Sequence, residues 1–165
     1  MVTSENERAV GSRALFAKVL VPIDFSSAAR AAFIMAMKMA REWGSEVILF
    51  NAPGPDGNDE FLDYTGVSWN TADVKREARG SLERFADTVV PGSASQVRIS
   101  VERADDPVAA IEHACRTHEP SLIVLGTHHR DKHKVFRSRA EKVARTVPCP
   151  VMFVRGEREV RVDAD

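Results

Sequence analysis

The chain has 165 residues, of which 44% are apolar and 28% charged, and its formal net charge is -1. This length suits one domain with one sizeable core, and the nearly neutral charge argues against bulk electrostatic binding to nucleic acid. No apolar run approaches the roughly 18–20 residues needed to cross a bilayer, and the polar N-terminus lacks the apolar block of a secretory signal. We therefore expect a cytoplasmic protein without a membrane partner.

Short apolar runs alternate with helical stretches, a pattern typical of β-α units around a parallel sheet. The first two strands are expected at 18–23 and 46–50, because both runs are continuously apolar, as in strands buried on both faces. Between them the sequence predicts a helix over 27–43, which begins after a capping Ser or Asp and stops at Gly44.

Residues 52–70 interrupt the alternation of strands and helices, because this segment is rich in turn-forming residues. Three aromatic residues within them, Phe61, Tyr64 and Trp69, suggest that part of the segment packs down as a flap. The next helix is predicted from apolar residues that recur at helical spacing. These are Val74, Ala78, Leu82, Phe85 and Val89.

The second half of the chain continues the alternation. A strand is expected at 96–102, a helix from Asp106-Pro107, a strand at 122–125 that ends at Gly126, and a strand at 151–154. A basic, histidine-rich loop over 127–137 precedes a capping-box sequence at 138–141, which starts the last helix. The five strands predict a doubly wound α/β fold with three layers. Ligands of such sheets bind beyond the carboxyl ends of the strands, where the strand order reverses.

Four stretches of the chain resemble the universal stress protein family. They are residues 21–26, 47–52, 121–128, and 140–143 taken with 148–151. The resemblance implies a universal stress protein domain over 15–155, between a polar tail at 1–14 and a charged tail at 156–165. It also implies a five-stranded parallel sheet of the adenine-nucleotide-hydrolase-like type, a dimer formed through the last strand, and a role in stress response. Some members of the family bind ATP and others do not.

The ATP-binding members carry Gly-x-x-Gly and, further on, Gly-Ser or Gly-Thr, and their first-strand Asp contacts the adenosine. Gly126 matches the first glycine, whereas His129 and Arg137 stand at the second and third glycine positions, in a shorter loop. Phosphate cradles use glycine because backbone N–H groups must approach the oxygens without a Cβ in the way. The sequence therefore predicts that conventional ATP binding is lost.

Part of an anion site remains in the sequence. Ser138 caps a helix whose first amides attract anions, and arginines such as Arg130 replace backbone contacts to phosphate in other proteins. This segment could bind another anion, bind a nucleotide in another pose, or form a solvated basic surface. Asp24 could contact a nucleotide or instead cap the start of the helix. The candidate nucleotide- or anion-binding residues are Pro22, Asp24, Ala52, Leu125, Gly126, Thr127, Arg130, Arg137 and Ser138.

Metal binding and catalysis have weak signatures. His128, His129, Asp131 and His133 fit no standard zinc spacing, and the cations around them would repel a divalent ion. No Gly-x-Ser-x-Gly nucleophile elbow is present. Cys115 and Cys149 are expected to be reduced packing residues, with a redox or metal role as the alternative. We expect a protein that is not an enzyme and holds no metal.

The last predicted strand is entirely apolar, with Val151, Met152, Phe153 and Val154 as candidate interface residues. An uncovered apolar edge is an aggregation risk unless another strand pairs with it. The function expected from the sequence is a homodimeric binding or regulatory module in stress response that is not a conventional ATP binder. The alternative is an ATP-binding stress protein with slow hydrolysis.

Overall fold

The computed structural model describes residues 16–54, 71–127 and 139–156. Five parallel strands form one sheet in the order β3-β2-β1-β4-β5, and this confirms the predicted fold class. The elements in chain order are β1 (Lys18–Pro22), α1 (Ser27–Trp43), β2 (Glu46–Asn51), α2 (Thr71–Val89), a 3-10 turn η1 (Ala94–Gln96), β3 (Val97–Val101), α3 (Pro107–His118), β4 (Leu122–Thr127), α4 (Arg139–Thr146) and β5 (Val151–Arg155).

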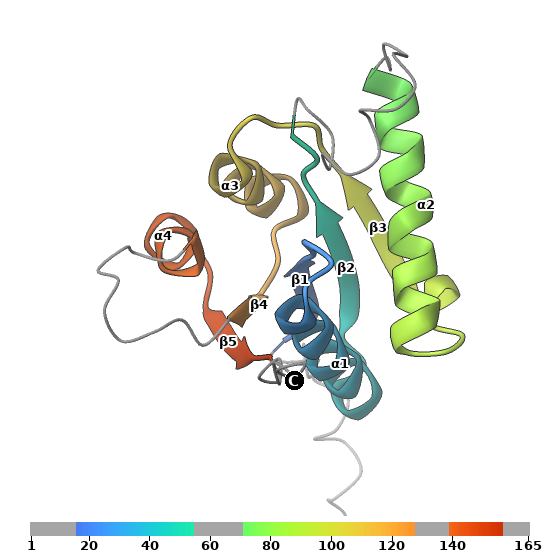
Figure 1. Ribbon diagram of the computed structural model, residues 1–165. Coiled ribbons are helices and arrows are strands. Elements are labelled where there is room, and N and C mark those ends of the chain that lie inside the picture. Colours follow the sequence, from blue (N-terminus) through green and yellow to red (C-terminus); the bar gives the residue numbers. More distant parts are fainter. Residues whose placement is uncertain (1–15, 55–70, 128–138, 157–165) are drawn as a thin grey trace, which may run out of the picture.

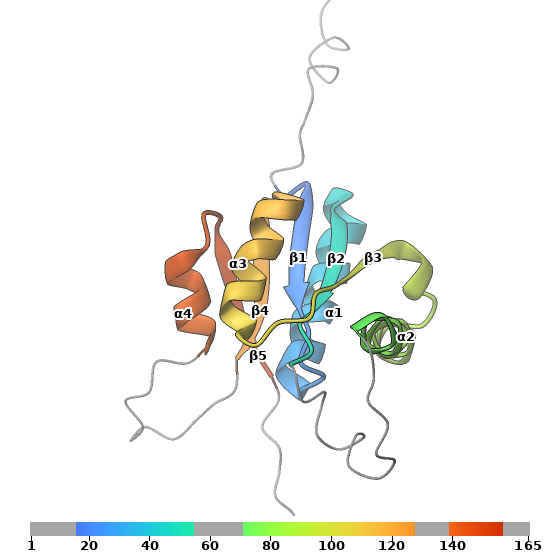
Figure 2. The ribbon, with the colours of Figure 1, turned by 90° about the horizontal axis from the view of Figure 1, so that it is seen from above.

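The helices cover both faces of the sheet, with α1 and α2 on one side and α3 and α4 on the other (Figures 1 and 2). Val19 and Val21 pack with the α1 side, whereas Leu20, between them in β1, packs with the α3 side. All three are fully buried. The continuous apolar runs in the sequence therefore reflect strands with a helix layer on each face.

Local signals set the helix ends. The Ser26 hydroxyl accepts a hydrogen bond from Ala29 N at 3.1 Å and caps α1, which ends at Gly44 in the left-handed conformation with φ of 69°. The Asp106 carboxylate accepts one from Val108 N at 2.9 Å, directly before Pro107 in the first turn of α3. These predicted caps are confirmed. They place the first turn of both helices at the carboxyl end of the sheet.

Several expectations lie outside the described residues: the flap with Phe61, Tyr64 and Trp69, the basic loop with its histidines, the Ser138 cap, and both tails. Within the described residues, β4 runs further than predicted, to Thr127. The same residues contain no helix with the length and apolar character that a membrane span requires.

Candidate functional site

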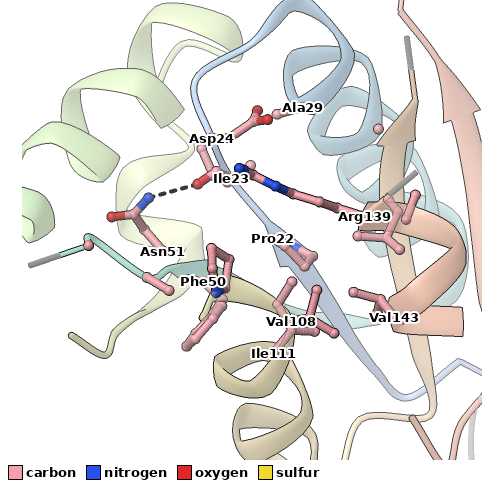
Figure 3. Close-up of a pocket in the computed structure, with 16 residues that line it drawn as sticks. Pro22, Ile23, Asp24, Ala29, Phe50, Asn51, Val108, Ile111, Arg139 and Val143 are labelled. Carbon is pink, nitrogen blue, oxygen red and sulfur yellow. Dashed lines mark hydrogen bonds between the residues drawn. The ribbon is translucent and has the colours of Figure 1, made fainter. Parts of the chain in front are cut away.

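A pocket lies where β1 and β4 separate at the carboxyl end of the sheet. The ladder between these strands pairs only Val19 with Leu122 and Leu20 with Ile123, whereas β1 and β2 pair along the whole of β1. The strand order also reverses here, because β1 leads to β2 on one side and β4 lies on the other. The described residues enclose a cavity of about 300 Å³ at this point (Figure 3).

The floor of the pocket is apolar. Phe50 from β2 and Leu125 from β4 lie beside Ile111 of α3 and Val143 of α4. Each of these side chains is at most 9% exposed. A floor of this kind suits a flat, weakly polar group, because such a group loses little hydration when it is buried there.

Asp24 lies on the rim, in the turn between β1 and α1. Its Oδ1 accepts hydrogen bonds from Ser26 N at 3.1 Å and from the Ser26 hydroxyl at 2.5 Å. Between them, Phe25 has a left-handed backbone with φ of 62°, which is unusual for an aromatic residue. Its ring packs edge-on against Phe85 of α2 at 5.6 Å between ring centroids. Asp24 therefore shapes the turn, while its Oδ2 accepts no hydrogen bond from the described residues.

Two polar residues outside the list of candidate site residues also line the pocket. The Asn51 side chain donates from Nδ2 to the carbonyl of Ile23 at 2.8 Å and so joins the ends of β2 and β1 at the pocket wall. Arg139 is the first residue of α4, and its exposed side chain extends across the pocket toward Ile23 (Figure 3). Arg139 forms no ion pair with another described residue.

Gly126 brings β4 close to the start of α1. A Cβ at this position would collide with the carbonyl group of Ala28 and would lie 2.6 Å from Ala29 N. Gly156, after β5, approaches the same turn, since a Cβ there would lie 2.8 Å from the Cα of Ala28. Both glycines are needed for packing against α1, whether or not a phosphate binds nearby.

The predicted site residues fall into three groups. Pro22, Asp24, Ala52, Leu125 and Gly126 line the pocket together. Thr127 is not among the lining residues, and its hydroxyl donates to the carbonyl of Val154 on β5 at 3.5 Å. Arg130, Arg137 and Ser138 lie outside the described residues.

The structure also describes the candidate interface residues of the last strand. Val151, Met152, Phe153 and Val154 lie on β5, which is an edge strand, and the Phe153 side chain is 48% exposed. Within residues 16–54, 71–127 and 139–156, no group of three or more His, Cys, Asp or Glu side chains is arranged to hold a metal ion.

The sheet order defines a doubly wound α/β domain, and the pocket lies at its switch point, where ligands of such sheets bind. The chain matches the model of the universal stress protein family over residues 15–155. It therefore belongs to the universal stress protein family. No curated protein matches the chain.

Solved structures show the same fold. UspA from Lactobacillus plantarum is 21% identical, with a TM-score of 0.59 over 85% of this chain and 98% of that one. A universal stress protein in complex with cAMP is 17% identical, with a TM-score of 0.64 over 87% and 99% of the two chains. The Archaeoglobus fulgidus protein in complex with dAMP is 18% identical, with a TM-score of 0.58 over 84% and 98%.

Proposed function

We propose that this protein is a non-catalytic, homodimeric binding module of the stress response whose pocket takes a nucleoside monophosphate in preference to ATP. One observation carries the proposal: the pocket between β1 and β4 has an apolar floor, one carboxylate at its rim, and one arginine across its mouth. The pocket combines groups suited to a base, a sugar and a phosphate.

Each part of the ligand has a matching group. The apolar floor around Phe50 and Leu125 takes the base, and the unoccupied oxygen of Asp24 accepts a hydrogen bond from a sugar hydroxyl. The Arg139 guanidinium pairs with the phosphate, because its planar fork matches phosphate oxygens. A volume of about 300 Å³ lies at the lower end of the range for small-molecule sites. The cAMP and dAMP complexes of two structural neighbours support a ligand of this class.

The preference against ATP rests on the sequence after Gly126. The family's triphosphate motif places glycines where this chain has His129 and Arg137. Phosphate cradles use glycine because main-chain amides must approach the phosphate oxygens without a Cβ in the way. A single phosphate that reaches Arg139 does not need that cradle.

We expect no phosphoryl transfer because of the acidic side chains that the pocket offers. Phosphoryl transfer requires a positioned base and, as a rule, an acidic side chain that holds a metal ion. Asp24 is the one acidic side chain that lines the pocket among the described residues, and its Oδ1 is already engaged by Ser26. Asp24 alone, with one oxygen already bound to Ser26, does not supply both the base and the metal ligand.

Isothermal titration of the protein with AMP, dAMP, cAMP, and ATP with and without Mg²⁺ tests the proposal. We expect AMP or dAMP to bind more tightly than ATP, and Arg139→Gln to weaken that binding about tenfold. Arg145→Gln is the matched control, because Arg145 lies on the same helix, is exposed, and does not line the pocket. Tighter binding of ATP, or equal losses in both variants, would contradict the proposal.

The alternative function, slow ATP hydrolysis, can be tested separately. A slow ATPase would release phosphate from ATP above the rate of the protein-free blank, and Asp24→Asn would remove that release. We expect no such release from the wild-type protein at any Mg²⁺ concentration.

The homodimer is supported by the edge strand. One side of β5 pairs with β4, and the other has no partner strand among the described residues. An apolar edge with a half-exposed Phe153 is stabilised when a second copy pairs with it. We therefore propose β5 as the dimer interface.

A further inference from the structure

The two cysteines of the chain meet on the α3 side of the sheet, away from the ligand pocket. Cys115 lies in the last turns of α3 and is 2% exposed. Cys149 lies between Pro148 and Pro150, in the segment that joins α4 to β5, and is partly exposed. They belong to the same packed cluster and line the same surface cavity, although they are distant in sequence.

Both cysteines are free, and Cys149 is the one that is partly exposed. They line a surface cavity of about 360 Å³ together with Arg116, Glu119, Pro120 and Pro148. None of these residues lines the pocket between β1 and β4. A small oxidant can therefore reach Cys149 without entering the ligand pocket.

We propose that Cys115 and Cys149 form an oxidisable dithiol that a peroxide converts into an intramolecular disulfide. In the first step the Cys149 thiolate attacks one peroxide oxygen, the O–O bond breaks, and water or an alcohol leaves as Cys149 becomes a sulfenic acid. In the second step the Cys115 sulfur attacks the sulfenic sulfur, the S–S bond forms, and water leaves. The two sulfurs together lose two electrons, and the peroxide gains them.

Cys149 is the first to react because it is the more exposed of the two. Burial raises the pKa of Cys115 to about 12 and also raises that of Cys149. Arg116, Glu112 and Glu119 are the charged groups around the pair, and Arg116 acts in the opposite direction to burial. Since the thiolate is the reactive form, the pair stays reduced under low peroxide and responds to sustained oxidation.

The disulfide would join α3 to the segment that follows α4, and both of these helices form walls of the ligand pocket. Val108 and Ile111 of α3, and Ala140 and Val143 of α4, line that pocket. The cross-link would hold the far end of α3 to the segment directly after α4. Closing this loop also restricts the unfolded chain, so we expect the oxidised protein to melt roughly 5–15 °C higher than the reduced one.

Peroxide treatment of the wild-type protein tests the proposal without relying on a variant. After oxidation, alkylation and mass spectrometry should show the loss of two hydrogens, no alkylated thiol, and a monomer size on a denaturing non-reducing gel. Because the chain has two cysteines, an intramolecular disulfide must join Cys115 to Cys149. Dithiothreitol should restore both thiols and the lower melting temperature.

The single variants Cys115→Ser and Cys149→Ser serve as controls and should show no reversible rise in melting temperature. Sulfinic acid at either cysteine without a cross-link, a disulfide between two copies, or two thiols that stay alkylatable after hours in peroxide would each overturn the proposal. This test is independent of nucleotide binding, so either proposal can fail alone.

Discussion

The backbone of Gly126, near the end of β4, lies directly against the carbonyl group of Ala28 in the first turn of α1. This approach fixes where α1 crosses the sheet, and α1 contacts both β1 and β4. The glycine that resembles the start of a phosphate motif thus has a packing role of its own. Its presence does not by itself indicate that a nucleotide binds.

Gly126→Ala should reduce the free energy of unfolding by about 1–3 kcal/mol, because the new methyl group would collide with backbone rather than with a flexible side chain. Urea denaturation measures the change. Gly80→Ala in α2 is the control, since its Cβ would meet only the end of the Arg84 side chain, at 3.2 Å. That variant should be more stable by about 0.5–1 kcal/mol, from helix propensity. Equal effects at the two positions would argue against the close approach at Gly126.

Ser26→Ala should destabilise the protein by about 1–2 kcal/mol, because it removes the α1 cap to Ala29 N and the hydroxyl that donates to Asp24. Ser27→Ala is a matched control one residue further along. The Ser27 hydroxyl oxygen is buried and has no hydrogen-bond partner among the described residues, so its removal should be neutral or stabilising. Thermal and urea unfolding distinguish the two variants. The prediction is wrong if both lose the same stability.

His118 should make stability depend on pH. Burial, with help from Arg98 and Lys18, lowers the pKa of His118 below its ordinary value, and Nε2 lies 2.9 Å from the Ser100 hydroxyl. The folded state then binds a proton less readily than the unfolded chain. The stability from neutral His118 is fully present above about pH 6.5 and is lost as the pH falls below the unfolded pKa toward the folded one.

Unfolding free energies measured between pH 7.5 and 5 should therefore fall less steeply in His118→Gln than in the wild type. Thr117→Gln, on the exposed side of the same helix, changes no titrating group and should keep the wild-type slope. Identical slopes in wild type and His118→Gln would show that His118 is not the group responsible.

Phe153→Glu should convert the proposed dimer into a monomer, because a charge would then stand on the exposed face of β5. Sedimentation velocity measures the mass in solution. Trp43→Glu replaces an aromatic side chain of similar exposure, 50%, on α1 and should leave the dimer intact. A wild-type protein that sediments as a monomer at micromolar concentration would contradict the interface.

The sequence predicted the elements that depend on local signals. Ser26, Gly44 and Asp106 act within a few residues, so their positions could be inferred from the chain alone. The directions of Arg139 and Asn51 depend on which strands and helices lie side by side, and no local pattern contains that information. His118 is half-buried beside Ser100 of β3, and this placement also depends on how distant elements pack. The contact between Cys115 and Cys149 joins distant parts of the chain, and it too could not be predicted.

The two-pair ladder between β1 and β4 divides the sheet into a half with β3, β2 and β1 and a half with β4 and β5. Across this division the strands share little backbone hydrogen bonding, and α1 contacts both sides. A small molecule seated in the opening touches both halves and opposes their separation. Occupancy should therefore slow amide hydrogen exchange in β1 and β4 together, including at residues that the molecule does not touch.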